Sequence, residues 1–453
     1  MKPIETKWWV LVAIGTGSFM SALDGSVVNT ILPVIQNAFR SSIVTIEWVV
    51  TIYLLVLSSL LLTFGRLGDL RGHKKVYLSG FAIFIVGSAL SGLAPSALSL
   101  ILFRALQALG AAMLASTAPA ILTKNFPAAK RGQALGLSAT MTYLGLTVGP
   151  SLGGWLAEQF SWRTVFYINV PVGALALGMS LYFIPADSPG GKHKKFDLAG
   201  AFTFMAGLIA LLLGLNQGSE WGWTSPSILL LFLAAAISLA VFVWLERRSS
   251  EPMLDLGLFR NSLFTASTVN AVFNYICLYS ILFLMPFYLI QGRTLNSAQA
   301  GLLLTALPIV MAVVTPISGT LSDRIGSRIP GMIGMATLGA GIYCLSRLDG
   351  GSPLWLASLG LAISGLGIGI FISPNSSALM GSAPTHQQGI ASGILASGRN
   401  VGMMLGIGLA GAILTSHLFA NTTGALFTGI RQGFLAAIGV ACLGVIASAV
   451  KNG

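Results

Sequence analysis

An aspartate and an arginine stand inside long apolar stretches of this 453-residue chain, where charged side chains are rare. Asp24 is the only acidic residue well inside such a stretch, and Arg104 lies within another. Removal from water favours the neutral form of a carboxyl group, so Asp24 could load and release a proton. Arg104 would pair with Asp24 and tune its affinity for that proton. The alternative is a structural ion pair, or a polar kink beside Gly25 and Asn29.

The composition predicts that both residues belong to a membrane protein. Hydrophobic residues make up 55% of the chain and charged residues 8%, whereas a soluble chain carries about 25% charged residues. This difference excludes a soluble enzyme, a coiled coil, a disordered protein and a nucleic-acid binder. The three cysteines all lie within apolar runs, so neither a disulfide framework nor a metal cluster is indicated.

Stretches of about 20 apolar residues, the length of a membrane-spanning helix, recur along the whole chain. We therefore predict an all-α polytopic membrane protein with 14 transmembrane helices. At about 1.5 Å per residue, Asp24 and Arg104 would lie roughly 13 and 10 Å from the outer ends of their helices, close enough to pair. The expected helices cover residues 8–32, 46–64, 76–94, 97–122, 133–157, 164–184, 198–215, 226–245, 263–290, 299–320, 330–346, 354–372, 389–415 and 431–450.

The basic residues are distributed unequally between the two sides of this arrangement. Eighteen of the 25 Lys and Arg residues fall in the N-terminal segment, in alternate loops or in the C-terminal tail, and five fall in the intervening loops. The positive-inside rule then predicts a multi-pass protein of the cell (cytoplasmic or inner) membrane with both termini in the cytoplasm. The net charge of +12 is in this interpretation an orientation signal.

The sequence also contains an internal repeat. The segment Gly65–Lys74 has the spacing G-x-L-x-D-x-x-G-x-[KR] and recurs 254 residues later as Gly319–Arg328. Glycines in and beside the stretch 133–157 recur in register around 389–415. Paired parallel repeats are an architecture of secondary transporters, with the substrate site between them near the membrane midplane. The predicted domains are an N-terminal six-helix bundle, a linker with two inserted helices and a C-terminal six-helix bundle, over residues 1–184, 185–262 and 263–453.

The stretch 133–157 combines spaced glycines with a proline. Gly145, Gly149 and Gly153 recur every four residues, which lines one helix face with hydrogen and lets a neighbouring helix approach closely. Pro150 removes a backbone hydrogen bond and permits a bend. The glycines would serve either conformational gating or ordinary tight packing.

The two copies of the repeated loop motif each carry an aspartate. Asp69 and Asp323 lie in turns with glycine and basic neighbours. A carboxylate in such a turn can cap a helix N-terminus and pair with Arg71 or Arg324. Because the motif occurs in both repeats, we favour a role in conformational change over a generic cap.

Together these motifs resemble the major facilitator superfamily, specifically its fourteen-helix drug/proton antiporter branch. The similar segments are Leu23–Pro33, Gly65–Lys75, Leu100–Gln107, Gly145–Gly154 and Trp162–Gly173. The resemblance implies that the loop motifs latch the cytoplasmic side closed in an outward-open state, and that the glycine motif controls opening between the halves. The residues assigned to gating are Gly65, Asp69, Arg71, Gly72, Asp323, Arg324, Gly145, Gly149, Pro150, Gly153 and Gly154.

The resemblance also implies a central cavity whose helices offer amide and aromatic side chains. A mostly apolar cavity with a few polar groups suits amphipathic compounds. Arg399 has no acidic partner obvious from the sequence, so it could bind carbonyl groups, face a water-filled path or attract an anionic group. The predicted cavity residues are Asn29, Gln107, Asn270, Asn274, Tyr275 and Arg399.

The leading hypothesis is a proton-coupled transporter that exports small lipophilic or amphipathic compounds by alternating access, as in multidrug, antibiotic or biocide efflux. The same fold could instead carry a lipid, a peptide or a metabolite, or work without protons. A channel and an intramembrane enzyme are more remote, because the sequence offers neither a selectivity ring nor a catalytic cluster. We expect no cofactor, no metal and no nucleic acid as partners, only the lipid bilayer, protons and a small-molecule substrate, and we expect a monomer.

Overall fold

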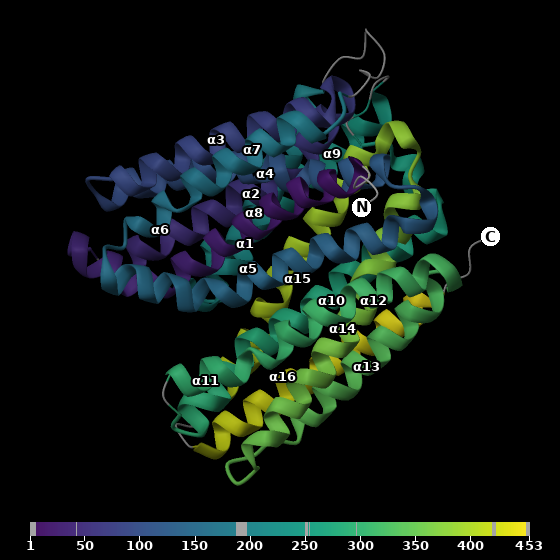
Figure 1. The fold of residues 1–453 in the computed structure, drawn as a ribbon. Coiled ribbons are helices and arrows are strands. Elements are labelled where there is room, and N and C mark those ends of the chain that lie inside the picture. Colours follow the sequence, from purple (N-terminus) through teal and green to yellow (C-terminus); the bar gives the residue numbers. More distant parts are fainter. Residues whose placement is uncertain are drawn as a thin grey trace, which may run out of the picture.

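The computed structural model is all-α in the residues that it describes, which are 6–41, 43–186, 197–249, 252, 254–295, 297–418 and 423–449. Two groups of helices converge at the end where α1 begins and α16 ends, and they diverge toward the end that carries α6 and α11 (Figure 1). We call the first the terminal end and the second the mouth. Residues 187–196, near the start of the linker segment predicted over 185–262, lie outside the described residues.

The helices follow the order expected from the apolar stretches. The first group comprises α1 (Thr6–Phe39), α2 (Ile43–Arg71), α3 (His73–Leu93), α4 (Ala97–Asn125), α5 (Arg131–Gln159), the short α6 (Thr164–Tyr167) and α7 (Asn169–Phe183). Two helices follow, α8 (Leu198–Trp221) and α9 (Pro226–Arg248). The last group comprises α10 (Ser262–Pro286), extended by a π-helical segment (Phe287–Gly292), α11 (Ser297–Leu304), α12 (Ala306–Ile325), α13 (Arg328–Ser346), α14 (Leu354–Ser382), α15 (Gln388–Leu418) and α16 (Thr423–Ser448).

Twelve helices in the described part of the chain are long and apolar enough to cross a membrane. This number does not support the predicted count of fourteen. The two long helices outside the set are α5, with 29 residues, and α15, with 31. Both are rich in glycine, and α15 carries Arg399 and Asn400 in its middle.

Equivalent helices of the repeat make equivalent contacts. Helix α1 packs against α5, and α10 packs against α15 in the same way. Two further pairs join the groups: α2 packs against α15, and α12 packs against α5. Helix α8 lies against α2 and α15, and α9 lies outside it against α8. Helices α5 and α15 therefore make most of the contacts between the two groups.

Candidate functional site: a buried ion pair beside a central cavity

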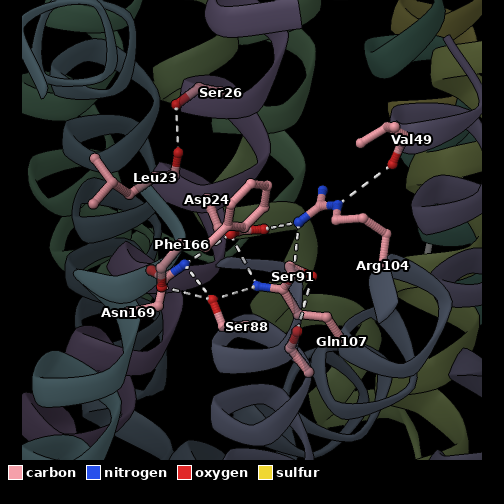
Figure 2. A network of polar contacts seen from close by, with 11 residues as sticks. Leu23, Asp24, Ser26, Val49, Ser88, Ser91, Arg104, Gln107, Phe166 and Asn169 are labelled. Carbon is pink, nitrogen blue, oxygen red and sulfur yellow. Dashed lines mark hydrogen bonds and ion pairs between the residues drawn. The ribbon is translucent and has the colours of Figure 1, made fainter. Parts of the chain in front are cut away.

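The structure brings Asp24 on α1 and Arg104 on α4 together in a buried ion pair (Figure 2). Arg104 Nη1 lies 2.6 Å from Asp24 Oδ2, and each residue is only 1% exposed. Arg104 Nε also donates a hydrogen bond to the carbonyl of Val49 on α2, at 3.4 Å. The guanidinium lies over the ring of Tyr53, 4.1 Å from its centroid. Side chains and backbone of α1 and α2 thus hold the arginine of α4 in place.

The second oxygen of Asp24 is held by amide groups. Its Oδ1 accepts hydrogen bonds from Gln107 Nε2 at 2.9 Å and from Asn169 Nδ2 at 2.8 Å. Both amides also donate to the hydroxyl of Ser88, which donates in turn to the carbonyl of Phe166 (Figure 2). Sequence reasoning assigned no role to Ser88 or Asn169. The one feature of the sequence that could have indicated them is that both are polar residues in apolar stretches.

These contacts give each carboxylate oxygen of Asp24 at least one donor. A proton on the carboxyl group would remove the charge that Arg104 pairs with, and separating a buried pair costs about 3–5 kcal/mol. Loss of either charge would therefore leave the other buried without its partner.

A cavity of about 1390 Å³ lies between the two groups of helices. Arg104 and Tyr53 form part of its wall, whereas Asp24 is not a lining residue and lies behind them. A compound in this cavity meets the guanidinium before it meets the carboxylate. The ion pair is thus placed to respond to the contents of the cavity.

Three of the six predicted cavity residues line it, namely Asn29, Tyr275 and Arg399. The prediction was wrong for the other three. Gln107 is fully buried against Asp24. Asn270 lies 3.0 Å from the hydroxyl of Ser448 on α16, and Asn274 donates to the sulfur of Met335 on α13 at 3.5 Å.

Helical periodicity explains the two errors on α10. Asn270 and Asn274 are four residues apart and share one face of the helix, which packs against α13 and α16. Tyr275 and Tyr279 share a different face, which lines the cavity. Because α10 is apolar on all sides, its sequence does not indicate which face is buried against other helices.

At the terminal end, the aspartates of the repeated motif each reach a helix of the opposite group. Asp69 on α2 accepts hydrogen bonds from the backbone N–H groups of Gly389 and Ile390, at 2.8 and 2.9 Å, at the start of α15. Asp323 on α12 accepts them from Gly132 and Gln133, at 2.9 and 3.0 Å, at the start of α5. We call these two contacts the latches. Each carboxylate satisfies free N–H groups and meets the positive end of a helix dipole.

Of the two contacts expected for these aspartates, the helix N-terminus is observed and the pairing with arginine is not. Arg71 and Arg324 are exposed, and within the described residues neither forms an ion pair with Asp69 or Asp323. A helix N-terminus in the other group supplies the positive partner instead. Asp69 also lies 3.3 Å from His73, a buried residue that the sequence did not single out.

Glycines allow the latched helices to approach closely. A Cβ atom on Gly65 would overlap the backbone of Gly389, and one on Gly319 would overlap the backbone of Gly132. Gly72 serves a different purpose: it joins α2 to α3 with φ of 96°, a conformation that favours glycine. The latches thus rest on backbone contacts that larger residues would block.

The glycine motif of α5 packs against α1, within one group of helices. A Cβ atom on Gly145 would lie 2.5 Å from the carbonyl oxygen of Phe19, and one on Gly153 would lie 2.6 Å from Val27. A Cβ atom on Gly149 would likewise overlap the side chain of Ser26. The glycines of this motif thus pack against α1 on both sides of Asp24, while the same helix also contacts α12 of the other group. Pro150 lies in the same helix, but its side chain is outside the described part.

Gly154 differs from the rest of the motif, since a Cβ atom there would meet nothing within 4 Å. We expect Gly145→Ala to destabilise the protein by about 1–3 kcal/mol, because α1 must shift to admit the methyl group. Gly154→Ala is the matched control in the same helix and should be tolerated. Thermal unfolding of the two purified variants measures the difference, and equal losses of stability would contradict this account of the motif.

Comparison with known proteins agrees with the architecture. The family model described as Major Facilitator Superfamily matches residues 14–197, 198–406 and 267–451. The multidrug resistance protein Stp of Mycobacterium tuberculosis is 35% identical over 418 residues, which cover 92% of this chain and 78% of Stp. The riboflavin transporter RibZ of Clostridioides difficile is 33% identical over 98% of this chain and 97% of its own.

A solved structure, that of the human organic anion transporter MFSD10 (TETRAN), superposes with a TM-score of 0.70 over 97% of this chain and all of the other. Its sequence identity of 15% means that the likeness concerns the fold alone. The family match covers nearly all of the chain, and two relatives above 30% identity extend over most of it. The chain therefore belongs to the major facilitator superfamily, a family of multi-pass membrane transporters of small molecules rather than enzymes.

Proposed function

We propose that this protein is a secondary transporter that exports small amphipathic compounds in exchange for protons. The observation that carries the proposal is the ion pair between Asp24 and Arg104, in which the arginine alone faces the cavity. An ionisable group buried in a membrane protein is costly and marks proton or substrate pathways. The name of Stp, a multidrug resistance protein, supports drug export as the direction and cargo.

In this proposal the protein works by alternating access, and the conformation with closed latches is outward-open. A proton on Asp24 would release Arg104 and allow α1 to move. Helix α1 is pressed against the glycines of α5, and the N-terminus of α5 is held by Asp323. A shift of α1 would thus act on a latch, which links proton binding to the opening of the terminal end.

The topology that we propose has fourteen membrane-spanning helices, the twelve already described together with α5 and α15. Polar and glycine-rich positions in such helices are tolerated where they face a cavity or other helices rather than lipid. The domains would be two six-helix halves, 1–184 and 263–453, with an inserted segment, 185–262. The terminal end and both chain termini would face the cytoplasm, since the positive-inside rule assigns the basic loops to that side of a cell membrane. The transporter would act as a monomer of the fourteen-helix drug/proton antiporter branch.

A metabolite is the second candidate cargo. RibZ, named as a riboflavin transporter, aligns over almost its entire length, whereas the alignment with Stp covers 78% of that protein. The cavity wall contains Tyr143, Tyr275 and Tyr279, whose rings could stack on a planar heterocycle.

Export from cells tests the proposal. A host that lacks its own major exporters would express the chain and be loaded with either a fluorescent amphipathic dye or riboflavin. We expect faster loss of dye than in cells with an empty vector, and we expect a proton uncoupler to remove the difference. Export that survives the uncoupler would contradict proton coupling, and faster loss of riboflavin alone would favour the metabolite.

A further inference from the structure

The charges on the cavity wall do not balance. Three of the described residues that line the cavity carry charge: Arg104, Glu158 and Arg399. Arg104 is neutralised by Asp24 at 2.6 Å. Glu158 is exposed, one residue before the end of α5 at the mouth. Arg399 remains as the charge deep in the cavity, and within the described residues it has no carboxylate partner.

Arg399 occupies a position where a single charge matters. It lies eleven residues into α15, so at about 1.5 Å per residue it is roughly 16 Å from the terminal end, near the middle of a bilayer about 30 Å thick. The side chain is half-buried. A guanidinium held in such surroundings without a counter-charge is costly, and an anion that enters the cavity would offset that cost.

The neighbours of Arg399 can bind the remainder of such a ligand. Tyr143 of α5 and Tyr279 of α10 are close enough to Arg399 to interact with its charge, and both line the cavity. The rings of Tyr275 and Tyr279 are 6.5 Å apart and inclined by 30°, which gives an aromatic wall. Their hydroxyl groups can donate to an acidic group, while the rings can hold an apolar body.

We propose that Arg399 is the anion-binding residue of the cavity and that the transported compounds are amphipathic organic acids, with a carboxylate bound to the guanidinium and an apolar or aromatic body against the tyrosines. A guanidinium fork binds a carboxylate through two parallel hydrogen bonds. The inference rests on the proposed function, because it names the substrate class of the same cavity. It also predicts that lipophilic cations are poor ligands.

Binding to the purified transporter in lipid nanodiscs tests this inference. The probes are pyrenebutyrate, its methyl ester and the trimethylammonium analogue, which share one aromatic body and differ in charge. Energy transfer from tryptophan to pyrene reports binding, since Trp155 lines the cavity, and empty nanodiscs give the background. We expect wild type to bind the carboxylate about tenfold more tightly than the ester, and the cation least.

Substitutions at Arg399 separate the inference from loss of folding. Arg399→Gln should lose the preference for the carboxylate and gain affinity for the cation, a gain that a misfolded protein would not give. Arg399→Lys should retain part of the preference, and Arg347→Gln, which removes an exposed arginine outside the cavity, should change nothing. An unchanged preference in Arg399→Gln, or a wild type that binds the cation best or none of the three probes, would overturn the inference.

The experiment needs no proton gradient, so its outcome is independent of coupling. Anion binding that depends on Arg399, together with export that ignores an uncoupler, would remove the proposed coupling and leave this inference standing. Proton-driven export without any anion preference would remove this inference and leave the proposed coupling standing.

Discussion

Asp24→Asn abolishes proton-driven accumulation of substrate in membrane vesicles, down to the level of vesicles without the protein, and leaves substrate binding in place. Asparagine has nearly the same shape and keeps one oxygen to accept from Gln107 and Asn169, which now hold Oδ1 at 2.9 and 2.8 Å. It cannot carry a proton, and it leaves the guanidinium of Arg104 without a counter-charge. Exchange of substrate between the two sides should therefore lose its dependence on a pH gradient.

An uncompensated Arg104 could also destabilise the variant, by about 3–5 kcal/mol if the buried pair is broken. The double variant Asp24→Asn with Arg104→Gln removes that charge, so it should recover stability without recovering coupling. Asp349→Asn, in an exposed loop, is the control for the loss of one carboxylate. Accumulation at the wild-type level in either the single or the double variant would contradict the role of Asp24.

The second large effect concerns the latches. Replacing Asp69 and Asp323 together by alanine removes four hydrogen bonds to helix N-termini. Loss of a capping residue costs about 0.5–2 kcal/mol, so two losses shift the equilibrium toward an open terminal end by roughly 5- to 1000-fold. We expect the cavity of this variant to become reachable from the terminal end.

A cysteine at Ser392 reports that opening. Ser392 is fully buried, lines the cavity and lies one turn from the latch residue Gly389. In a background without Cys277, Cys344 and Cys442, a membrane-impermeant maleimide applied from the terminal side should label the double alanine variant much faster than the latched protein. The matched control replaces Arg71 and Arg324 by alanine, and it should remain closed. Equal labelling of the two variants would show that the exposed arginines, and not the helix N-termini, hold the terminal end.

The parts of this picture that depend on local pattern could be predicted from the sequence. The apolar stretches indicated nearly every helix, the repeated motif indicated equivalent turns, and the depths of Asp24 and Arg104 in their helices indicated that the two could meet. Each of these inferences uses a periodicity or a distance along one helix. None requires knowledge of how distant helices pack.

The parts that failed depend on contacts between distant segments. Asp69 reaches a residue 320 positions away, and Asp323 one that is 191 positions away, so the nearby arginines were the only partners that sequence could suggest. Asn169 and Ser88 join the Asp24 network for the same reason, since α3 and α7 meet only in the folded protein. The glycine motif indicated a close helix contact but not which helix makes it.

The central claim is that export of substrate and uptake of a proton occur together at Asp24. The most direct test uses proteoliposomes without an imposed pH gradient, in which an outward substrate gradient drives transport and a pH-sensitive dye reports proton movement. We expect wild type to move protons against the direction of the substrate, and Asp24→Asn to move substrate without any change of pH. Proton movement of equal size in the two proteins, or none in wild type while substrate moves, would contradict the claim.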